Sequence, residues 1–119
     1  MKETKRLLET IIEGLQVKKG KKIVTIDLTE IQGSICDFFV VCEGNTTTQV
    51  SALSDSVWDV VADQLKIKPL GAIGMQEAQW VAMDYGSIIV HIFLPDLRAY
   101  YKLENLWADA RITEIPDIL

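Results

Sequence analysis

The run "ICDFFVVCE", residues 35–43, is short and almost continuously apolar. A strand with one solvated face alternates apolar and polar residues, so a run without that alternation is typical of a strand that is covered on both faces. Packed layers must then lie above and below the strand. The run therefore predicts an inner strand of a sheet that carries helices, which favours an α/β fold.

Helical periodicity marks three other parts of the chain. Apolar residues fall on one helical face over 3–17, and a second apolar stripe runs to about Leu65. The second helix begins near Thr46, which has the spacing to Gln49 of a capping box, in which each side chain satisfies a free backbone N–H at the helix start. The third helix begins at Pro95. Its predicted apolar stripe consists of Leu97, Tyr100, Leu103 and Trp107.

Strand patterns fill the segments between these helices. The pattern predicts strands over 20–28, 78–84 and 87–94, with Tyr85-Gly86 as a tight hairpin turn between the last two. The glycine-interrupted "LGAIGM" that precedes them predicts a short strand or a loop. The expected order is α-β-β-α-β-β-β-α, and a mixed β-sheet with helices packed on it is the simplest architecture for that order.

The length of the chain, 119 residues, favours one domain. We expect that domain to span 1–119, with its core at about 5–107 and an acidic, weakly patterned tail at 108–119 that suits a docking arm. No apolar run approaches the ~20 residues that a membrane span needs. The N-terminus leads into an amphipathic pattern rather than the apolar block of a signal peptide. A cytoplasmic protein without a membrane partner is therefore expected.

The charge of the chain bears on its partners. The formal net charge is −5, whereas a nucleic-acid-binding protein usually shows a basic excess or a basic stripe. The one basic cluster, at residues 18–22, is short and typical of a solvated turn. An acidic chain suits a basic partner protein better than a phosphate backbone, so we expect no sequence-specific binding of nucleic acid.

The two cysteines predict neither a disulfide nor a metal site. Cys36 and Cys42 are six residues apart, and on one straight strand they would face the same side at a separation of ~20 Å. A disulfide needs Cα atoms within roughly 7 Å of each other. Together with the single histidine, His91, they form no recognisable pattern of metal ligands. Buried, reduced thiols are expected.

Two features of the sequence bear on catalysis. His91 shares its strand face with apolar residues such as Ile89, where a lone histidine is more often a packed structural residue than a general base. Gly33-Ser34 followed by Asp37 hints at a nucleotidyltransferase, but such an enzyme needs two or three carboxylates around its metal ion, and Asp37 stands alone. We therefore expect no catalytic residue, no metal and no cofactor. A nucleotide-handling enzyme is kept as an alternative function.

The segment "QWVAMDYGSIIVHIF", residues 79–93, predicts a surface for a partner. If Val81 and Met83 face the core, then Trp80 and Asp84 point outward or toward a second layer. An outward tryptophan beside a tyrosine in a turn, Tyr85, is typical of interfaces, because both rings bury a large area with few rotatable bonds. The alternative is that Trp80 packs under the glycine-rich segment 71–74, and the pattern alone leaves both open.

Three segments, "GNTTTQVSAL", "AQWVAMDYGSIIVHIF" and "RAYYKLENLW", together resemble the ribosomal silencing factor family, also called the RsfS or Iojap family. The resemblance covers roughly residues 5–107. It implies a non-enzymatic protein with a mixed α/β fold that is related to nucleotidyltransferases but lacks their catalytic carboxylates. It also implies a homodimer that binds large-subunit ribosomal protein L-fourteen and sterically stops the small subunit from joining, so that translation falls when nutrients are short.

The residue pattern and the resemblance together predict roles for individual residues. Trp80, Asp84 and Tyr85 are expected to bind the partner, while His91, Tyr100, Tyr101 and Trp107 are expected to serve dimerisation or structure. The chain departs from the family where Thr48 stands in place of an arginine that members often carry after the second strand. Besides the nucleotide-handling enzyme, a dimerisation module in ribosome assembly is the other alternative.

Overall fold

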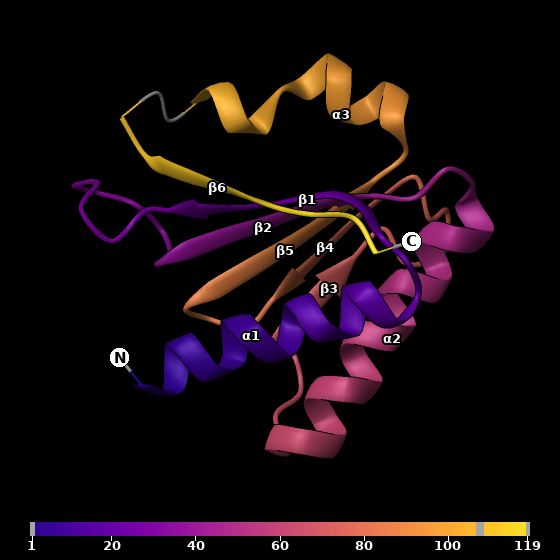
Figure 1. Cartoon of the computed structure of the whole chain (residues 1–119), viewed down its shortest axis with the longest axis horizontal. Coiled ribbons are helices and arrows are strands. Elements are labelled where there is room, and N and C mark those ends of the chain that lie inside the picture. Colours follow the sequence, from indigo (N-terminus) through magenta and orange to yellow (C-terminus); the bar gives the residue numbers. More distant parts are fainter. Residues whose placement is uncertain (1, 107–108, 119) are drawn as a thin grey trace.

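The computed structural model describes residues 2–106 and 109–118, and it consists of helices packed on both faces of one sheet (Figure 1). The mixed α/β fold expected from the sequence is confirmed. In chain order the elements are α1 (Lys2–Val17), β1 (Lys21–Asp27), β2 (Phe38–Glu43), α2 (Thr47–Leu65), β3 (Gly71–Ile73), β4 (Trp80–Asp84), β5 (Ile88–Phe93), α3 (Pro95–Tyr101), the 3-10 helix η1 (Leu103–Leu106) and β6 (Arg111–Ile115).

The sheet has six strands in the order β3-β4-β5-β2-β1-β6. Strands β2 and β5 run parallel, and the other neighbouring strands within the described residues run antiparallel. Strand β2 lies inside the sheet, with Val40 packed in the core on one face and Val41 in the core on the other. The prediction that the apolar run of β2 is covered on both faces is therefore confirmed.

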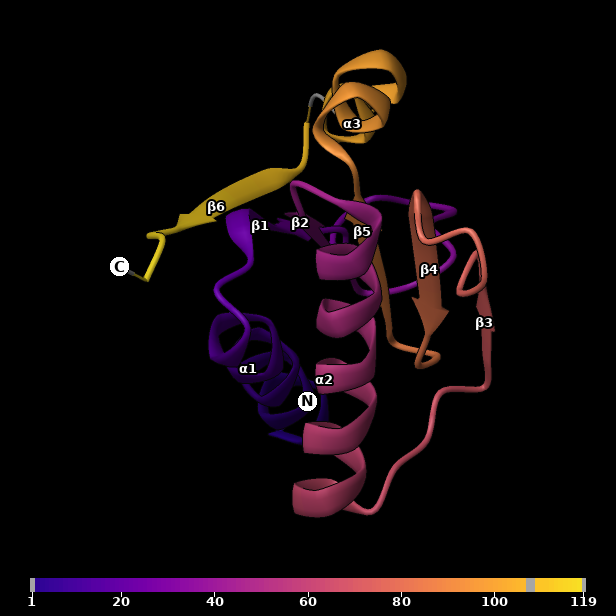
Figure 2. The ribbon, with the colours of Figure 1, turned by 90° about the vertical axis from the view of Figure 1, so that its right-hand side faces the viewer.

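Helices α1 and α2 lie side by side on one face of the sheet and form the larger core with it (Figures 1 and 2). The two helices cross closely because α1 carries Gly14 at the crossing, where an added Cβ atom would lie 3.0 Å from the Cα of Val57. At the same point the hydroxyl of Ser56 donates a 2.7 Å hydrogen bond to the carbonyl oxygen of Gly14. The close approach buries the apolar stripes of both helices against the strands.

Helix α2 starts as the sequence predicts. Thr46 is its N-cap, and its Oγ1 accepts a 3.0 Å hydrogen bond from the backbone N–H of Gln49. The side chain of Gln49 reaches back and accepts from the backbone N–H of Asn45 at 2.7 Å, one residue earlier than a capping box requires. The cap therefore survives in a slightly shifted form.

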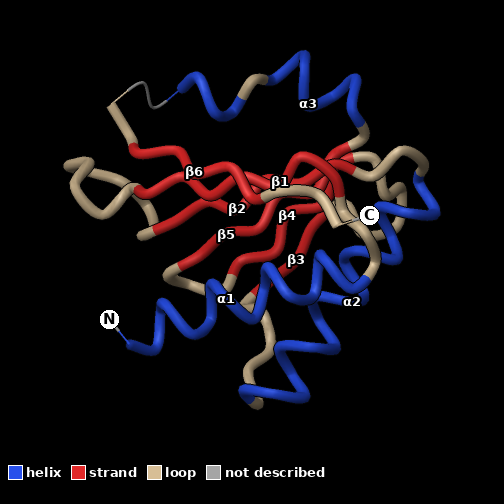
Figure 3. The backbone as a smooth tube through the Cα atoms, viewed as in Figure 1, coloured by secondary structure: helices blue, strands red, loops and turns tan. Residues whose placement is uncertain are grey.

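The opposite face of the sheet carries α3 and η1, a much shorter helical layer (Figure 3). Helix α3 ends at Tyr101 because Lys102 adopts the left-handed backbone conformation, with φ 50°. Leu97 and Leu103 pack on the core as expected. Tyr100, also expected in that stripe, is instead 78% exposed. Trp107 lies outside the described residues.

The C-terminal segment contains a strand that the sequence analysis missed. Residues Arg111–Ile115 form β6 and pair antiparallel with β1, with Thr113 opposite Thr25 and Ile115 opposite Ile23. The segment was expected to be a weakly patterned arm, but its backbone pairs along the edge of the sheet. Only Ile115 among these five residues is partly buried, which explains why the segment lacks a clear apolar pattern.

Both cysteines are free and buried, as expected. They lie on opposite faces of the sheet, because Cys36 precedes β2 and belongs to the core under α3, whereas Cys42 belongs to the core under α1 and α2. Burial raises the pKa of the Cys36 thiol to about 11 and that of Cys42 to about 12, so both stay protonated at neutral pH. In the described part of the chain, no helix has the length and apolar character to cross a bilayer.

Candidate partner-binding surface

Strand β4 places its side chains as the sequence predicts. Val81 and Met83 are fully buried against α2 and the larger core, so Trp80, Ala82 and Asp84 face the side that carries α3. Trp80 and Ala82 are partly buried, and Asp84 is exposed. The short α3 layer therefore leaves this edge of the sheet open to solvent.

The strand register extends this open area beyond β4. Ile73 of β3 lies opposite Ala82, and Ile89 of β5 lies opposite Asp84, so their side chains point to the same face. Ile73 is 72% exposed, and Tyr101 borders the area from α3. We call this area the Trp80 surface. It consists of Ile73, Trp80, Ala82, Asp84, Ile89 and Tyr101.

The indole of Trp80 is held on three sides. Its ring stacks on Phe93, with centroids 4.8 Å apart and an interplanar angle of 28°, and it lies 4.8 Å from the ring of Tyr101. Its Nε1–H donates a 3.1 Å hydrogen bond to Nδ1 of His91. At the glycine segment, Gly74 approaches the backbone carbonyl of Trp80, while the ring contacts described here are with Phe93, Tyr101 and His91.

His91 is buried behind Trp80. Its ring makes an edge contact with Phe39 at a centroid distance of 4.8 Å, and burial lowers the pKa of His91 from 6.5 to about 4. Because Nδ1 accepts the hydrogen bond from Trp80, the imidazole is neutral and carries its proton on Nε2. No acceptor within the described residues lies in hydrogen-bond reach of Nε2. This placement agrees with the structural role expected for His91.

The hairpin turn after β4 forms as predicted, but Tyr85 does not lie on the surface. The N–H of Tyr85 donates to the carbonyl oxygen of Ile88 at 2.8 Å, and Asp84 Oδ1 accepts from the N–H of Gly86 at 2.7 Å. The side chain of Tyr85 is only 7% exposed and packs in the larger core, and burial raises the pKa of its phenol to about 12. Its expected exposure at the turn is wrong, because residue 85 continues the alternation that points Val81 and Met83 inward.

The aromatic residues of α3 occupy different positions. Tyr101 touches Trp80 and is 46% exposed, while Tyr100 projects into solvent and meets Tyr101 edge-on at 5.1 Å. Their expected part in dimerisation stays a prediction. The same holds for Trp107, which lies outside the described residues.

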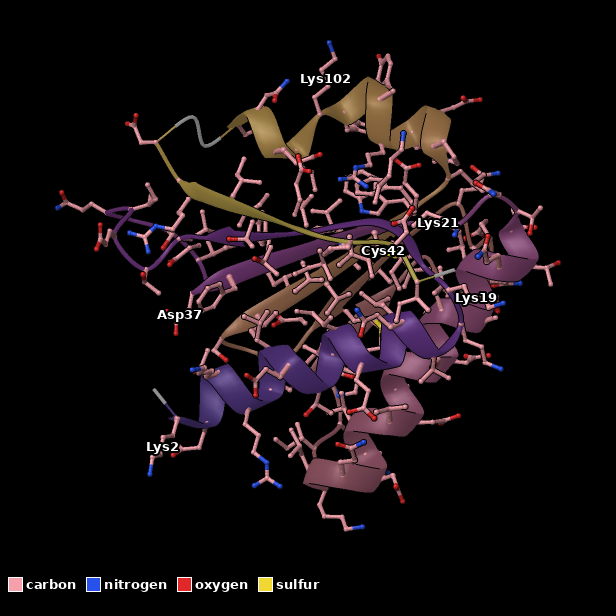
Figure 4. The ribbon with its side chains drawn as sticks, viewed as in Figure 1. Lys2, Lys19, Lys21, Asp37, Cys42 and Lys102 are labelled. Carbon is pink, nitrogen blue, oxygen red and sulfur yellow. The ribbon has the colours of Figure 1, made fainter. Side chains whose placement is uncertain are left out.

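Gly33 and Ser34, from the alternative nucleotide site, form part of a turn. Ser34 donates a 3.2 Å hydrogen bond to the carbonyl oxygen of Leu28, which occupies its hydroxyl within the turn, and Gly33 has the left-handed φ of 81° that the turn requires. Asp37 lies at one end of the sheet, and the basic cluster at residues 18–22, which includes Lys19 and Lys21, lies at the other end (Figure 4). Across residues 2–106 and 109–118, no group of three or more His, Cys, Asp or Glu side chains could hold a metal ion.

Arg98 fixes α3 to the sheet, and sequence reasoning missed it. Its guanidinium donates to the carbonyl oxygen of Lys22 at 2.6 Å and lies 3.3 Å from the carboxylate of Glu43 and 2.9 Å from that of Glu104. The Lys22 carbonyl is turned toward it by an irregularity in β1, where Lys22 has φ 51°. Two hollows, of about 580 and 650 Å³, flank this group. No local pattern marks Arg98, because the acceptors on β1 and β2 are far away in the sequence.

Comparison with known proteins agrees with this architecture and with the motifs on β4 and β5. The family model described as "Ribosomal silencing factor during starvation" matches residues 1–119. A ribosomal silencing factor of Halalkalibacterium halodurans is 37% identical over 114 residues, which is 95% of each chain. One of Bacillus subtilis is 34% identical over 111 residues, which covers 93% of this chain and 92% of that protein.

A solved structure supports the same relationship. The crystal structure of a Chromobacterium violaceum protein superposes with a TM-score of 0.82 at 30% identity, and the match covers 94% of this chain and 92% of the other. The structural match covers nearly the whole chain, and the range that the family model matches includes β6. The chain therefore belongs to the ribosomal silencing factor family.

Proposed function

We propose that this protein represses translation by binding the large ribosomal subunit through ribosomal protein L-fourteen, and that the bound protein sterically keeps the small subunit from joining when nutrients are limited. Membership of the silencing factor family supports the regulatory role, and this family is not a known class of enzymes. The partner protein and the steric mechanism are inferred from the family resemblance. We place this activity in the cytoplasm, where subunits join.

The observation that carries the proposal is the Trp80 surface. It combines a tryptophan and a tyrosine that are pre-packed against each other with an exposed aliphatic residue, Ile73, and an exposed carboxylate, Asp84. Aromatic anchors surrounded by partly covered apolar groups are typical of the centre of protein interfaces. The carboxylate and the net charge of −5 suit a basic protein partner.

The test is co-sedimentation of the purified protein with isolated large subunits, together with an assay of subunit joining. We expect saturable binding and a loss of joining in proportion to it. Trp80→Ala should weaken binding by about 2 kcal/mol or more, as truncation of an interface anchor does. Because the ring also packs on Phe93, unfolding of this variant is measured alongside. Normal joining at saturating protein would refute the proposal.

The same preparation separates the alternatives. Binding of a nucleotide with Mg²⁺ in calorimetry would support a nucleotide-handling enzyme. Binding to precursors of the large subunit but not to mature subunits would support a module for ribosome assembly. We also propose that the protein forms a homodimer. The family resemblance supports it, and so do the tyrosines of α3, because Tyr100 is 78% exposed and Tyr101 is 46% exposed.

A further inference from the structure

We propose that His91 is a positioning residue of the Trp80 surface, whose Nδ1 fixes the indole of Trp80 in the orientation that the large-subunit partner contacts. This inference rests on the proposed function, because it specifies how the proposed surface is prepared for its partner. His91 itself does not reach the surface, as it is only 8% exposed.

The contacts of Trp80 restrict both torsions of its side chain. Phe93 and Tyr101 pack on the ring, but ring contacts of this kind do not specify the direction in which the indole N–H points. The hydrogen bond from Nε1 to His91 removes that freedom, because only one orientation of the indole brings its N–H to Nδ1 at 3.1 Å. An anchor that is ordered before binding loses less conformational entropy when the partner arrives.

His91 occupies a position whose aromatic neighbours would also suit a phenylalanine. Its ring lies among Phe39, Phe93 and Trp80, which are aromatic neighbours. Its Nε2 is buried with no acceptor among the described residues, so an apolar ring here would break no hydrogen bond between Nε2 and those residues. What histidine offers here, and phenylalanine does not, is the acceptor for Trp80.

The surroundings keep His91 neutral, which the acceptor role requires. Among the titratable and charged groups on this side of the sheet are Asp84 of β4, Cys36 before β2, and Tyr101 of α3. Glu43 of β2 and Glu104 of η1 also lie here, and both pair with Arg98. Burial lowers the pKa of His91 far enough that Nδ1 stays unprotonated at neutral pH.

The hydrogen bond also specifies what the partner meets. The indole proton is used inside the protein, so Trp80 presents carbon atoms and its π-system at the surface and needs no acceptor from the partner. Apolar side chains, or the cationic groups of a basic protein that stack on aromatic rings, are the groups that suit it. This agrees with the acidic side chain of Asp84 on the same strand face.

The test compares three variants. His91→Phe keeps an aromatic ring but removes the acceptor, whereas His91→Asn keeps an acceptor near the position of Nδ1 but removes the ring. Trp80→Phe removes the donor. Stability is measured by denaturant unfolding and affinity by co-sedimentation with large subunits. We expect His91→Phe to be at least as stable as His91→Asn, yet to bind roughly 3- to 10-fold more weakly than the wild type, the effect of one hydrogen bond. His91→Asn should recover part of that binding although it packs less well.

A double-mutant comparison shows whether His91 acts through Trp80. In the Trp80→Phe background, His91→Phe should cause no further loss of binding. The indole N–H resonance of Trp80 in nitrogen-15 NMR should move, and its exchange with solvent should accelerate, in His91→Phe alone.

The inference would be overturned if folded His91→Phe bound large subunits with the affinity of the wild type. It would also be overturned if His91→Phe lowered the affinity equally in the wild-type and Trp80→Phe backgrounds. If the wild-type protein does not bind large subunits at all, the proposed function fails and the positioning role fails with it. If instead the wild type binds large subunits and His91→Phe binds them equally well, the positioning role alone is overturned.

Discussion

The guanidinium of Arg98 lies 3.3 Å from the carboxylate of Glu43, and the two side chains are only 9% and 12% exposed. Arg98 lies on α3 and Glu43 ends β2, so the pair joins this helix to the sheet. It holds α3 where Tyr101 can contact Trp80. A buried ion pair adds little over well-packed apolar side chains, but the loss of one partner leaves an uncompensated buried charge. The pair therefore makes the position of α3 sensitive to single substitutions.

Arg98→Met should lower the free energy of unfolding by about 3–5 kcal/mol, because Glu43 stays buried without its cation. Urea denaturation monitored by circular dichroism measures the change. Lys102→Met is the matched control, since Lys102 lies on the rim of the same hollow but is exposed. Equal denaturation midpoints for Arg98→Met and the control would show that the pair does not hold the helix.

Gly14→Ala should destabilise the protein by about 2 kcal/mol, as overpacking of a close helix crossing does. Alanine favours a helix over glycine by about 1 kcal/mol, so propensity alone predicts the opposite sign. The control is Gly71→Ala, where an added Cβ meets no atom within 4 Å. A rise in the thermal midpoint of Gly14→Ala would mean that the crossing relaxes without strain.

Asp84→Lys should slow association with large subunits and reverse the salt dependence of the association rate, because its carboxylate is exposed on the face proposed to meet a basic partner. Asp84→Asn should give an intermediate rate, since it removes the charge but keeps an acceptor for the N–H of Gly86. Stopped-flow measurements at several salt concentrations provide the rates. Asp63→Lys reverses an exposed charge on α2, on the opposite face, and should leave the rate nearly unchanged. The same rate for Asp84→Lys and Asp63→Lys would place the partner elsewhere.

Stability should fall between pH 6.5 and about 4 as His91 titrates. The folded state holds the pKa of His91 at about 4, whereas the unfolded chain takes up the proton near 6.5. As the pH falls through this window the unfolded state binds more protons, so the stabilisation that is complete above pH 6.5 is lost progressively, by up to ~3 kcal/mol at ~1.4 kcal/mol per pH unit. Urea midpoints measured across the window should fall less steeply in His91→Phe. Asp27 does not contribute there, because hydrogen bonds from Thr29 lower its pKa below 3.8. If the urea midpoints of the wild type and His91→Phe fell equally with pH, the loss of stability would not come from His91.

Light scattering at micromolar concentration should give twice the 13.4 kDa mass of one chain. If the second copy packs on α3, Tyr100→Lys should shift the protein toward the monomer, because it places a charge on the most exposed ring of that helix. Leu70→Lys, at an equally exposed apolar position beside β3, is the control. A 13.4 kDa species alone would reject the homodimer.

Local periodicity was sufficient to predict most of the elements and the orientation of β4. Alternation placed Val81 and Met83 inside and Trp80 outside, and the same rule would have placed Tyr85 inside had it been continued one residue into the turn. Turn residues are usually assumed to be exposed, which is why the burial of Tyr85 was missed. The capping pattern at Thr46 was equally reliable because all its partners are local.

The missed features depend on contacts between distant residues. Strand β6 has little buried surface of its own and is defined by its pairing with β1. The partial cover of Trp80 by Tyr101 depends on where α3 lies, which Arg98 sets through groups on β1 and β2. Neither the left-handed Lys102 that ends α3 nor the acceptors of Arg98 leave a periodic signal in the sequence.

The pairing of β6 with β1 joins the last described strand to the first, with Ile112 opposite Ile26. During synthesis, β1 emerges early and must wait for almost the whole chain before its outer edge is covered. Until then it presents unpaired backbone groups, which invite pairing with other chains. Chains that are cut short before Arg111 would keep that edge open. The C-terminal segment therefore protects the outer edge of β1 from pairing with other chains.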